Sequence, residues 1–145
     1  MSENVLEKII KKKIERIDLL KKSVSLNYLS EKINENKSNL TNSLVDILLI
    51  QNIKDIKIYE PKLDIYSDHV IISTATSNTQ MNSALTKIIK HIKSLGLEAL
   101  SEGINSSWIL LQSNGISLHI FTEEARDYYS IEDLYFDSNL VNQYG

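Results

Sequence analysis

Two apolar runs separated by an Asn-Gly pair constrain the fold more than any other feature of this sequence. Residues 108–111 read Trp-Ile-Leu-Leu, and residues 116–120 read Ile-Ser-Leu-His-Ile. Asn114 and Gly115 lie between them, and such a pair favours a tight hairpin turn because both residues tolerate a left-handed backbone. We therefore predict an antiparallel hairpin, which needs further strands and a layer of helices to bury its apolar side chains.

The residues before the hairpin alternate between helical and strand-like spacing. The expected elements are an apolar helix over residues 40–51 and strands over residues 56–58, 69–74 and 97–100. Apolar residues three and four positions apart also predict a helix that begins near Ser77 or Asn78 and ends at Gly96.

The residues after the hairpin contain two helix-start signals. Thr122 is placed to cap a helix over residues 123–129, and Ser130 with Asp133 matches a capping box for a last helical turn. The complete order predicts an α/β fold, with a mixed sheet of about five strands flanked by helices.

The first 39 residues have a different pattern. Apolar residues from Val5 to Leu20 predict an amphipathic helix, and a shorter pattern follows from Leu26 to Ile33. Residues 34–39 are polar enough to form a linker. We therefore divide the chain into a helical N-terminal extension with its linker, residues 1–39, and a main domain, residues 40–145.

Charge is unevenly distributed between these two parts. Residues 1–39 carry 9 Lys and Arg against 6 Asp and Glu, a net charge of +3, and the remainder carries 7 against 13, a net charge of -6. An acidic body is a poor non-specific ligand for nucleic acid, so we expect no DNA partner, and it suits a basic protein better. No stretch approaches the roughly 18 apolar residues of a membrane span, so we expect no membrane partner and a cytoplasmic location.

The residues needed for common catalytic and cofactor sites are missing. The chain has no cysteine, and its four glycines do not form a phosphate-binding loop. His69, His91 and His119 do not show the spacing of a metal site. We expect a protein that is not an enzyme and that has no cofactor or metal. The alternative is a magnesium-dependent nucleotidyltransferase-like enzyme that uses Asp64 and Asp68.

Large aromatic residues gather in the last third of the chain, interleaved with charged ones. They are Trp108, Tyr128, Tyr129, Tyr135 and Phe136. Aromatic residues beside an arginine are typical of binding hot spots, although a tryptophan that begins a hairpin strand is as often part of the core. The two adjacent tyrosines point about 100° apart on a helix, so at least one of them should lie near the surface.

The same residues carry a resemblance to a known family. The residues from Ser67 to Gln80 resemble an apolar strand, small-residue turn and Ser-x-Arg-Gln pattern, and the Trp108 hairpin resembles a Trp-x-Leu and His-x-Phe pattern. The residues from Glu124 to Tyr135 match Glu-x-Arg-x-aromatic-Tyr-x-Leu-Glu-x-Leu-aromatic. Over residues 40–137 the chain is therefore similar to ribosomal silencing factors of the Iojap family.

This resemblance implies a nucleotidyltransferase-like fold without the catalytic residues. It implies a translational repressor that binds the large ribosomal subunit at its fourteenth protein, a basic protein, and blocks association with the small subunit. Organellar relatives assist large-subunit assembly, which leaves an adaptor in that assembly as an alternative. Relatives often form dimers, so a homodimer is one possible state, but the sequence itself does not report the oligomeric state. The implied partner-binding residues are Trp108, Leu110, Glu124, Arg126, Tyr128, Tyr129, Glu132, Leu134 and Tyr135.

A second, weaker resemblance concerns the extension. Residues 3–33 are similar to the first helices of indole-3-glycerol-phosphate synthases. That enzyme's barrel needs about 250 residues and has no counterpart here, so the resemblance implies no catalytic role.

Overall fold

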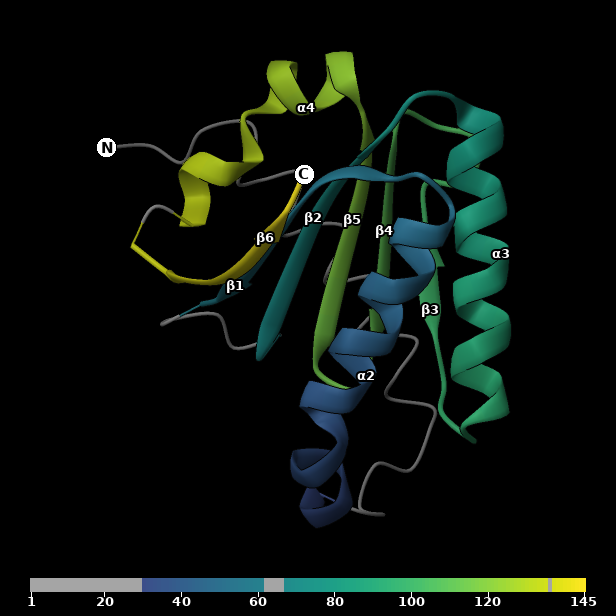
Figure 1. Cartoon of the computed structure of the whole chain (residues 1–145), viewed down its shortest axis with the longest axis vertical. Helices are drawn as coiled ribbons and strands as arrows, with labels where there is room; N and C mark the ends of the chain where they lie inside the picture. The colour runs from purple at the N-terminus through teal and green to yellow at the C-terminus, as the bar shows by residue number, and fades with distance from the viewer. Residues whose placement is uncertain (1–29, 62–66, 136) are drawn as a thin grey trace.

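A computed structural model of the chain describes residues 30–61, 67–135 and 137–145, with side chains from residue 39 onward (Figure 1). The elements in chain order are α2 (Ser30–Ile50), β1 (Lys54–Glu60), β2 (His69–Ala75), α3 (Asn78–Ser94), β3 (Leu100–Glu102), β4 (Trp108–Ser113), β5 (Ile116–Thr122), α4 (Glu123–Tyr129), the 3-10 helix η1 (Ile131–Tyr135) and β6 (Asn139–Tyr144). The predicted helix from Val5 to Leu20 lies outside the described residues.

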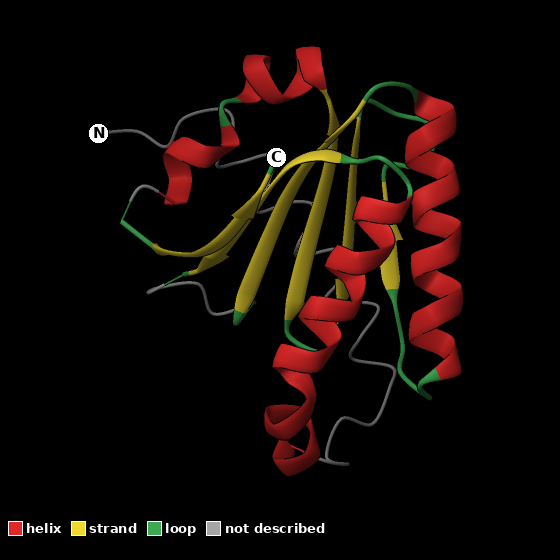
Figure 2. Cartoon of the chain, in the orientation of Figure 1, coloured by secondary structure: helices red, strands yellow, loops and turns green. Residues whose placement is uncertain are grey.

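One mixed sheet of six strands forms the centre of the molecule, in the order β3-β4-β5-β2-β1-β6 (Figure 2). The α/β class and the mixed sheet are confirmed. β2 and β5 run parallel and all other neighbours are antiparallel. The sixth strand, β6, was not predicted. Its Leu140 and Val141 are exposed, and an edge strand in contact with solvent lacks the apolar alternation that marks a half-buried strand.

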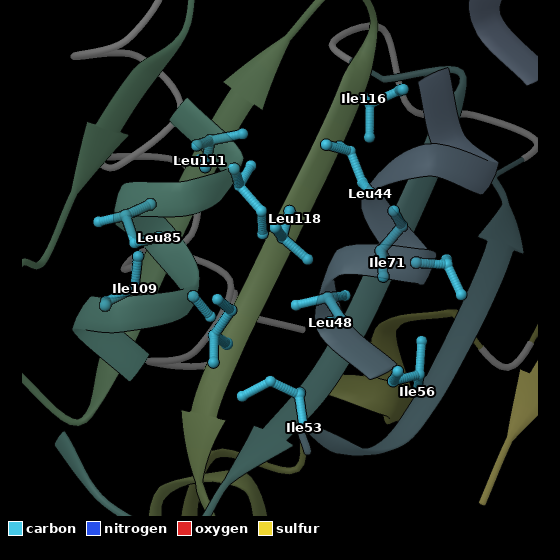
Figure 3. Close-up of a cluster of buried hydrophobic side chains, with 14 of the residues drawn as sticks. Leu44, Leu48, Ile53, Ile56, Ile71, Leu85, Ile109, Leu111, Ile116 and Leu118 are labelled. Atoms are coloured by element: carbon cyan, nitrogen blue, oxygen red, sulfur yellow. The ribbon is translucent and has the colours of Figure 1, made fainter. Parts of the chain in front are cut away.

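Both faces of the central strands are covered, so every residue of β4 is buried. On one face, α2 and α3 pack on the sheet and enclose the larger cluster of apolar side chains (Figure 3). Ile71, Leu111 and Leu118 point into this cluster from three neighbouring strands, and Leu44 and Leu48 meet them from α2. Burial on both sides explains why these strands are continuously apolar.

The opposite face carries a second, more aromatic cluster. It consists of Tyr59, Val70, Ile72, Trp108, Leu110, Phe121, Ala125, Ile131 and Tyr135. α4 and η1 contribute Ala125, Ile131 and Tyr135, and they close this face over one end of the sheet. The second cluster therefore supports the C-terminal segment that contains most of the predicted partner-binding residues.

The local signals of the sequence are confirmed at several places. Asn114 (φ 53°) and Gly115 (φ 80°) form the hairpin turn between β4 and β5. Ser77 accepts a hydrogen bond from the backbone N–H of Gln80 and caps α3, and Gly96 follows that helix in a left-handed conformation.

Three local expectations differ from the structure. Residues 34–39, predicted as a linker, belong to α2, because neither Gly nor Pro interrupts the chain there. The strand expected at residues 97–100 is β3, which begins at Leu100. Ser130 does not form a capping box, because it takes a left-handed conformation that ends α4 and its hydroxyl donates to the Asp127 carbonyl.

The division of the chain at residue 39 stays a prediction. Within the described residues, no helix combines the length and the apolar character that a membrane span requires.

Candidate docking surface

α4 and η1 together form the surface on which most of the predicted partner-binding residues lie, and we call residues 123–135 the α4–η1 surface. Thr122 starts α4 by accepting a hydrogen bond from the backbone N–H of Ala125. Glu123 and Glu124 occupy the first turn, where carboxylates are favourable beside the exposed backbone N–H groups. The left-handed Ser130 then turns the chain into η1.

Arg126 and Glu132 hold this surface on the sheet. Nε of Arg126 donates to Oε1 of Glu132 at 2.7 Å, and Nζ of Lys57 on β1 donates to Oε2 of the same carboxylate at 2.7 Å. Nη1 of Arg126 also donates to the Asp55 carbonyl at 2.5 Å and to Oγ1 of Thr74 at 2.7 Å. One guanidinium therefore connects α4 with η1, β1 and β2.

The charges of this network stabilise each other. Burial alone would raise the pKa of Glu132, but the hydrogen bonds from Arg126 and Lys57 outweigh burial, and the pKa of the carboxyl lies below its usual value. The hydrogen bond to Glu132 raises the pKa of Lys57 above its usual value. Glu132 and Lys57 are therefore both charged at neutral pH, and the carboxylate accepts hydrogen bonds from Lys57 and Arg126.

An open depression of about 480 Å³ lies beside this network. It is lined by Asp55, Lys57, Thr74, Glu123, Arg126, Asp127, Ser130, Glu132 and Asp133. The two basic side chains are already bound to Glu132, whereas Glu123, Asp127 and Asp133 are exposed and form no ion pair with any described residue. The depression is therefore acidic toward solvent.

The predicted aromatic residues separate into core and surface. Trp108 is only 3% exposed, donates from Nε1 to Nδ1 of His119 at 3.1 Å, and stacks on Phe121 with ring centroids 5.0 Å apart. Tyr129 covers the indole at 4.9 Å. Tyr128 lies on the outside of α4 and is 82% exposed. The expectation that one of the two tyrosines reaches the surface is confirmed.

The nine predicted partner-binding residues therefore differ in what they can contact. The exposed ones are Glu124 and Tyr128, the half-buried ones are Arg126, Tyr129, Glu132 and Leu134, and the buried ones are Trp108, Leu110 and Tyr135. Partner binding by these nine residues stays a prediction. Because Trp108, Leu110 and Tyr135 are buried, they can only support the α4–η1 surface from inside the fold.

Sequence reasoning missed three residues that complete the network. Asp55, Lys57 and Thr74 lie on β1 and β2, 52 to 75 residues before their partners. No local pattern marks them, because the register of the sheet brings them under α4.

The structure offers little for the magnesium alternative. Asp68 is exposed just before β2, and Asp64 lies outside the described residues. Among the residues that the structure describes, no group of three His, Asp or Glu side chains could hold a metal ion. The histidines contact protein groups: His69 bonds to Thr41 and His91 to Ser43, both at 3.0 Å.

Comparison with known proteins gives a match over most of this fold. A protein-family model described as "Ribosomal silencing factor during starvation" matches residues 34–144. The match begins inside α2 and includes β6, so it covers the complete sheet.

Two proteins named ribosomal silencing factor RsfS are similar in sequence. One, from Haemophilus influenzae, is 32% identical over 71 residues, which are 48% of this chain and 70% of that protein. The other, from Zymomonas mobilis, is 28% identical over 71 residues, 48% of this chain and 53% of that protein.

Solved structures share the fold. A crystal structure of a Chromobacterium violaceum protein superimposes with a TM-score of 0.64 at 26% identity, covering 68% of this chain and 84% of that one. A Bacillus halodurans structure also gives 0.64, at 20% identity, covering 72% of this chain and 98% of that one.

Proposed function

Because this chain belongs to the family of ribosomal silencing factors, as the match over residues 34–144 shows, we propose that it represses translation by binding the large ribosomal subunit. In this proposal the bound protein occupies the face to which the small subunit would attach. It acts by obstruction and needs no catalytic residue. The partner on the large subunit is its fourteenth protein, a basic protein.

One observation carries this proposal beyond the family match: the acidic character of the α4–η1 surface. Glu123, Glu124, Asp127 and Asp133 are exposed and form no ion pair with a described residue. Arg126 does not offset these charges outside, because its guanidinium is turned inward and its side chain is only 10% exposed. A surface of this kind attracts a basic partner and orients it during approach.

The exposed ring of Tyr128 offers a partner an apolar contact, which the acidic side chains of the α4–η1 surface do not provide. Aromatic side chains dominate binding energy when a partner covers them. Tyr128 stands on Tyr129, with the two rings edge to face at 5.0 Å, and Tyr129 rests on the buried Trp108. The contact with Tyr129 restricts the orientation of the exposed ring, which lowers the entropy lost when a partner binds.

The test is whether the purified chain binds isolated large subunits and keeps small subunits from joining them. Co-sedimentation measures the first effect, and gradient profiles of mixed subunits measure the second. We expect a Glu124→Gln, Asp127→Asn variant to bind about tenfold more weakly. An Asp46→Asn, Glu98→Gln variant is the matched control, since it removes two exposed carboxylates from α2 and from the residues before β3.

If the unaltered chain leaves subunit joining unchanged, the proposed function is wrong. An equal loss of binding in the control variant would show that net charge matters and the α4–η1 surface does not. A chain that binds large-subunit precursors but leaves mature subunits free to join would support the alternative, an adaptor in large-subunit assembly.

A further inference from the structure

The outward face of α3 carries three lysines and no acidic residue. Lys87, Lys90 and Lys93 are exposed and follow one another at every third position. The buried side chains of the helix are Met81, Ala84, Leu85, Ile88 and Ile92. Because a helix turns about 100° per residue, Lys90 lies directly opposite this buried stripe, with the other two lysines on either side. We call Lys87, Lys90 and Lys93 the lysine ridge.

The ridge makes no polar side-chain contact with the part of the chain that the structure describes. None of the three lysines forms an ion pair or a side-chain hydrogen bond with a residue that the structure describes. Favourable interaction with the helix dipole accounts for Lys93 in the last turn of α3, but the effect fades within one turn and does not account for Lys87.

The ridge and the acidic α4–η1 surface lie on different sides of the molecule. α3 packs with α2 on the face of the larger cluster, and α4 packs on the aromatic cluster of the opposite face. Figure 1 shows α3 along the right flank of the sheet and α4 at the upper end of the strands. A chain with a net charge of -3 thus separates a positive ridge from a negative docking surface.

We propose that the lysine ridge contacts the phosphate backbone of RNA that borders the flank of α3 while the α4–η1 surface docks on a neighbouring protein. This inference rests on the proposed function, in which the partner is a particle of RNA and protein. Lysine is a flexible point charge that suits phosphates without reading bases.

The test compares three chains in binding to isolated large subunits over a range of salt concentrations. They are the unaltered chain, a variant with Lys87→Gln, Lys90→Gln and Lys93→Gln, and a variant with the same three lysines changed to arginine. Glutamine keeps the helix propensity and removes the charge. For the glutamine variant, we expect the slope of log affinity against log salt to become shallower by up to about 2 to 3, because each neutralised phosphate contributes about 0.7 on a single strand and about 0.9 on a duplex. The arginine variant should keep the steep slope.

Equal slopes for the unaltered and glutamine chains would overturn the proposal that the lysine ridge contacts RNA. They would not affect the proposal that the α4–η1 surface docks on a protein. The Glu124→Gln, Asp127→Asn variant separates the two ideas, because it should lose affinity while the ridge is unchanged. If the unaltered chain fails to bind subunits at all, the proposed function fails. The ridge is then tested on an RNA duplex at low salt, where binding that disappears in the glutamine variant supports it and any other result overturns it.

Discussion

Arg126 and Glu132 are joined by a 2.7 Å hydrogen bond from Nε to Oε1, and they face each other across the turn between α4 and η1. The same carboxylate accepts a second hydrogen bond from Lys57. Two residues that the motif suggested as partner contacts are thus bonded to each other and to the sheet. Their first role is to hold the acidic surface in shape.

Arg126→Lys should destabilise the fold by roughly 1–3 kcal/mol. A lysine has a single nitrogen, which cannot reach Glu132, the Asp55 carbonyl and Thr74 from one position. Urea unfolding followed by circular dichroism measures the change. The reverse change at an exposed site, Lys93→Arg, is the control and should leave stability within about 0.5 kcal/mol. Equal stability of the two variants would mean that the Arg126 bonds contribute nothing.

Glu132→Gln should lower stability by roughly 1–2 kcal/mol at neutral pH, and this difference should shrink in acid. The pKa of Glu132 is lowered in the folded state, so its contribution is complete above the unfolded pKa and is lost as the pH falls through the folded one. The pKa of Lys57 is raised, so its part is lost only as the pH rises through its folded value. Unfolding measured at neutral pH and below about pH 4 checks this, and a difference independent of pH contradicts it.

Gly103→Ala should destabilise the chain far more than Gly96→Ala. Both glycines have a positive φ, which costs an alanine roughly 1–2 kcal/mol. At Gly103 a Cβ atom would also collide with the carbonyl oxygen of Trp108, whereas at Gly96 it would meet nothing within 4 Å. Thermal unfolding of the two variants gives the comparison. A similar loss of stability in both variants would show that the backbone at Trp108 can move away from the added Cβ atom at little cost.

Trp108→Phe should cost roughly 1–3 kcal/mol, because the buried Nδ1 of His119 loses its donor. Tyr129→Phe is the matched control, since it keeps the ring that covers Trp108 and removes only a hydroxyl. We expect it to change stability by no more than about 0.5 kcal/mol. Circular dichroism is the appropriate signal, because Trp108 is the single tryptophan. An equal loss of stability in the two variants would show that the hydrogen bond from the Trp108 N–H group contributes little and that its ring supplies the stabilisation.

Tyr128→Ala should leave stability nearly unchanged and weaken binding to large subunits at least tenfold. The ring is 82% exposed, so few interactions within the fold depend on it. Leu95→Ala, at an apolar residue 52% exposed beyond the end of α3, is the control and should bind normally. Normal binding by the Tyr128 variant would remove this residue from the docking surface.

Much of the local structure could be predicted from the sequence. The hairpin at Asn114 and Gly115, the Ser77 cap and the start of α4 at Thr122 depend on residues within a few positions of one another. β6 escaped prediction because an exposed edge strand needs no apolar pattern. The helix over residues 34–39 was not predicted, because polar residues indicate exposure to solvent and do not exclude a helical backbone.

The candidate site divides in the same way. The sequence by itself determined the α/β class, the acidic charge of α4 and the adjacency of two tyrosines, all of which are properties of neighbouring residues. Only the tertiary structure decided that Trp108 belongs to the core while Tyr128 faces outward. It also decided that Arg126 and Glu132 meet Lys57, 75 residues before Glu132. Such interactions depend on sheet register and on which face a helix covers, and both are set by packing between distant segments.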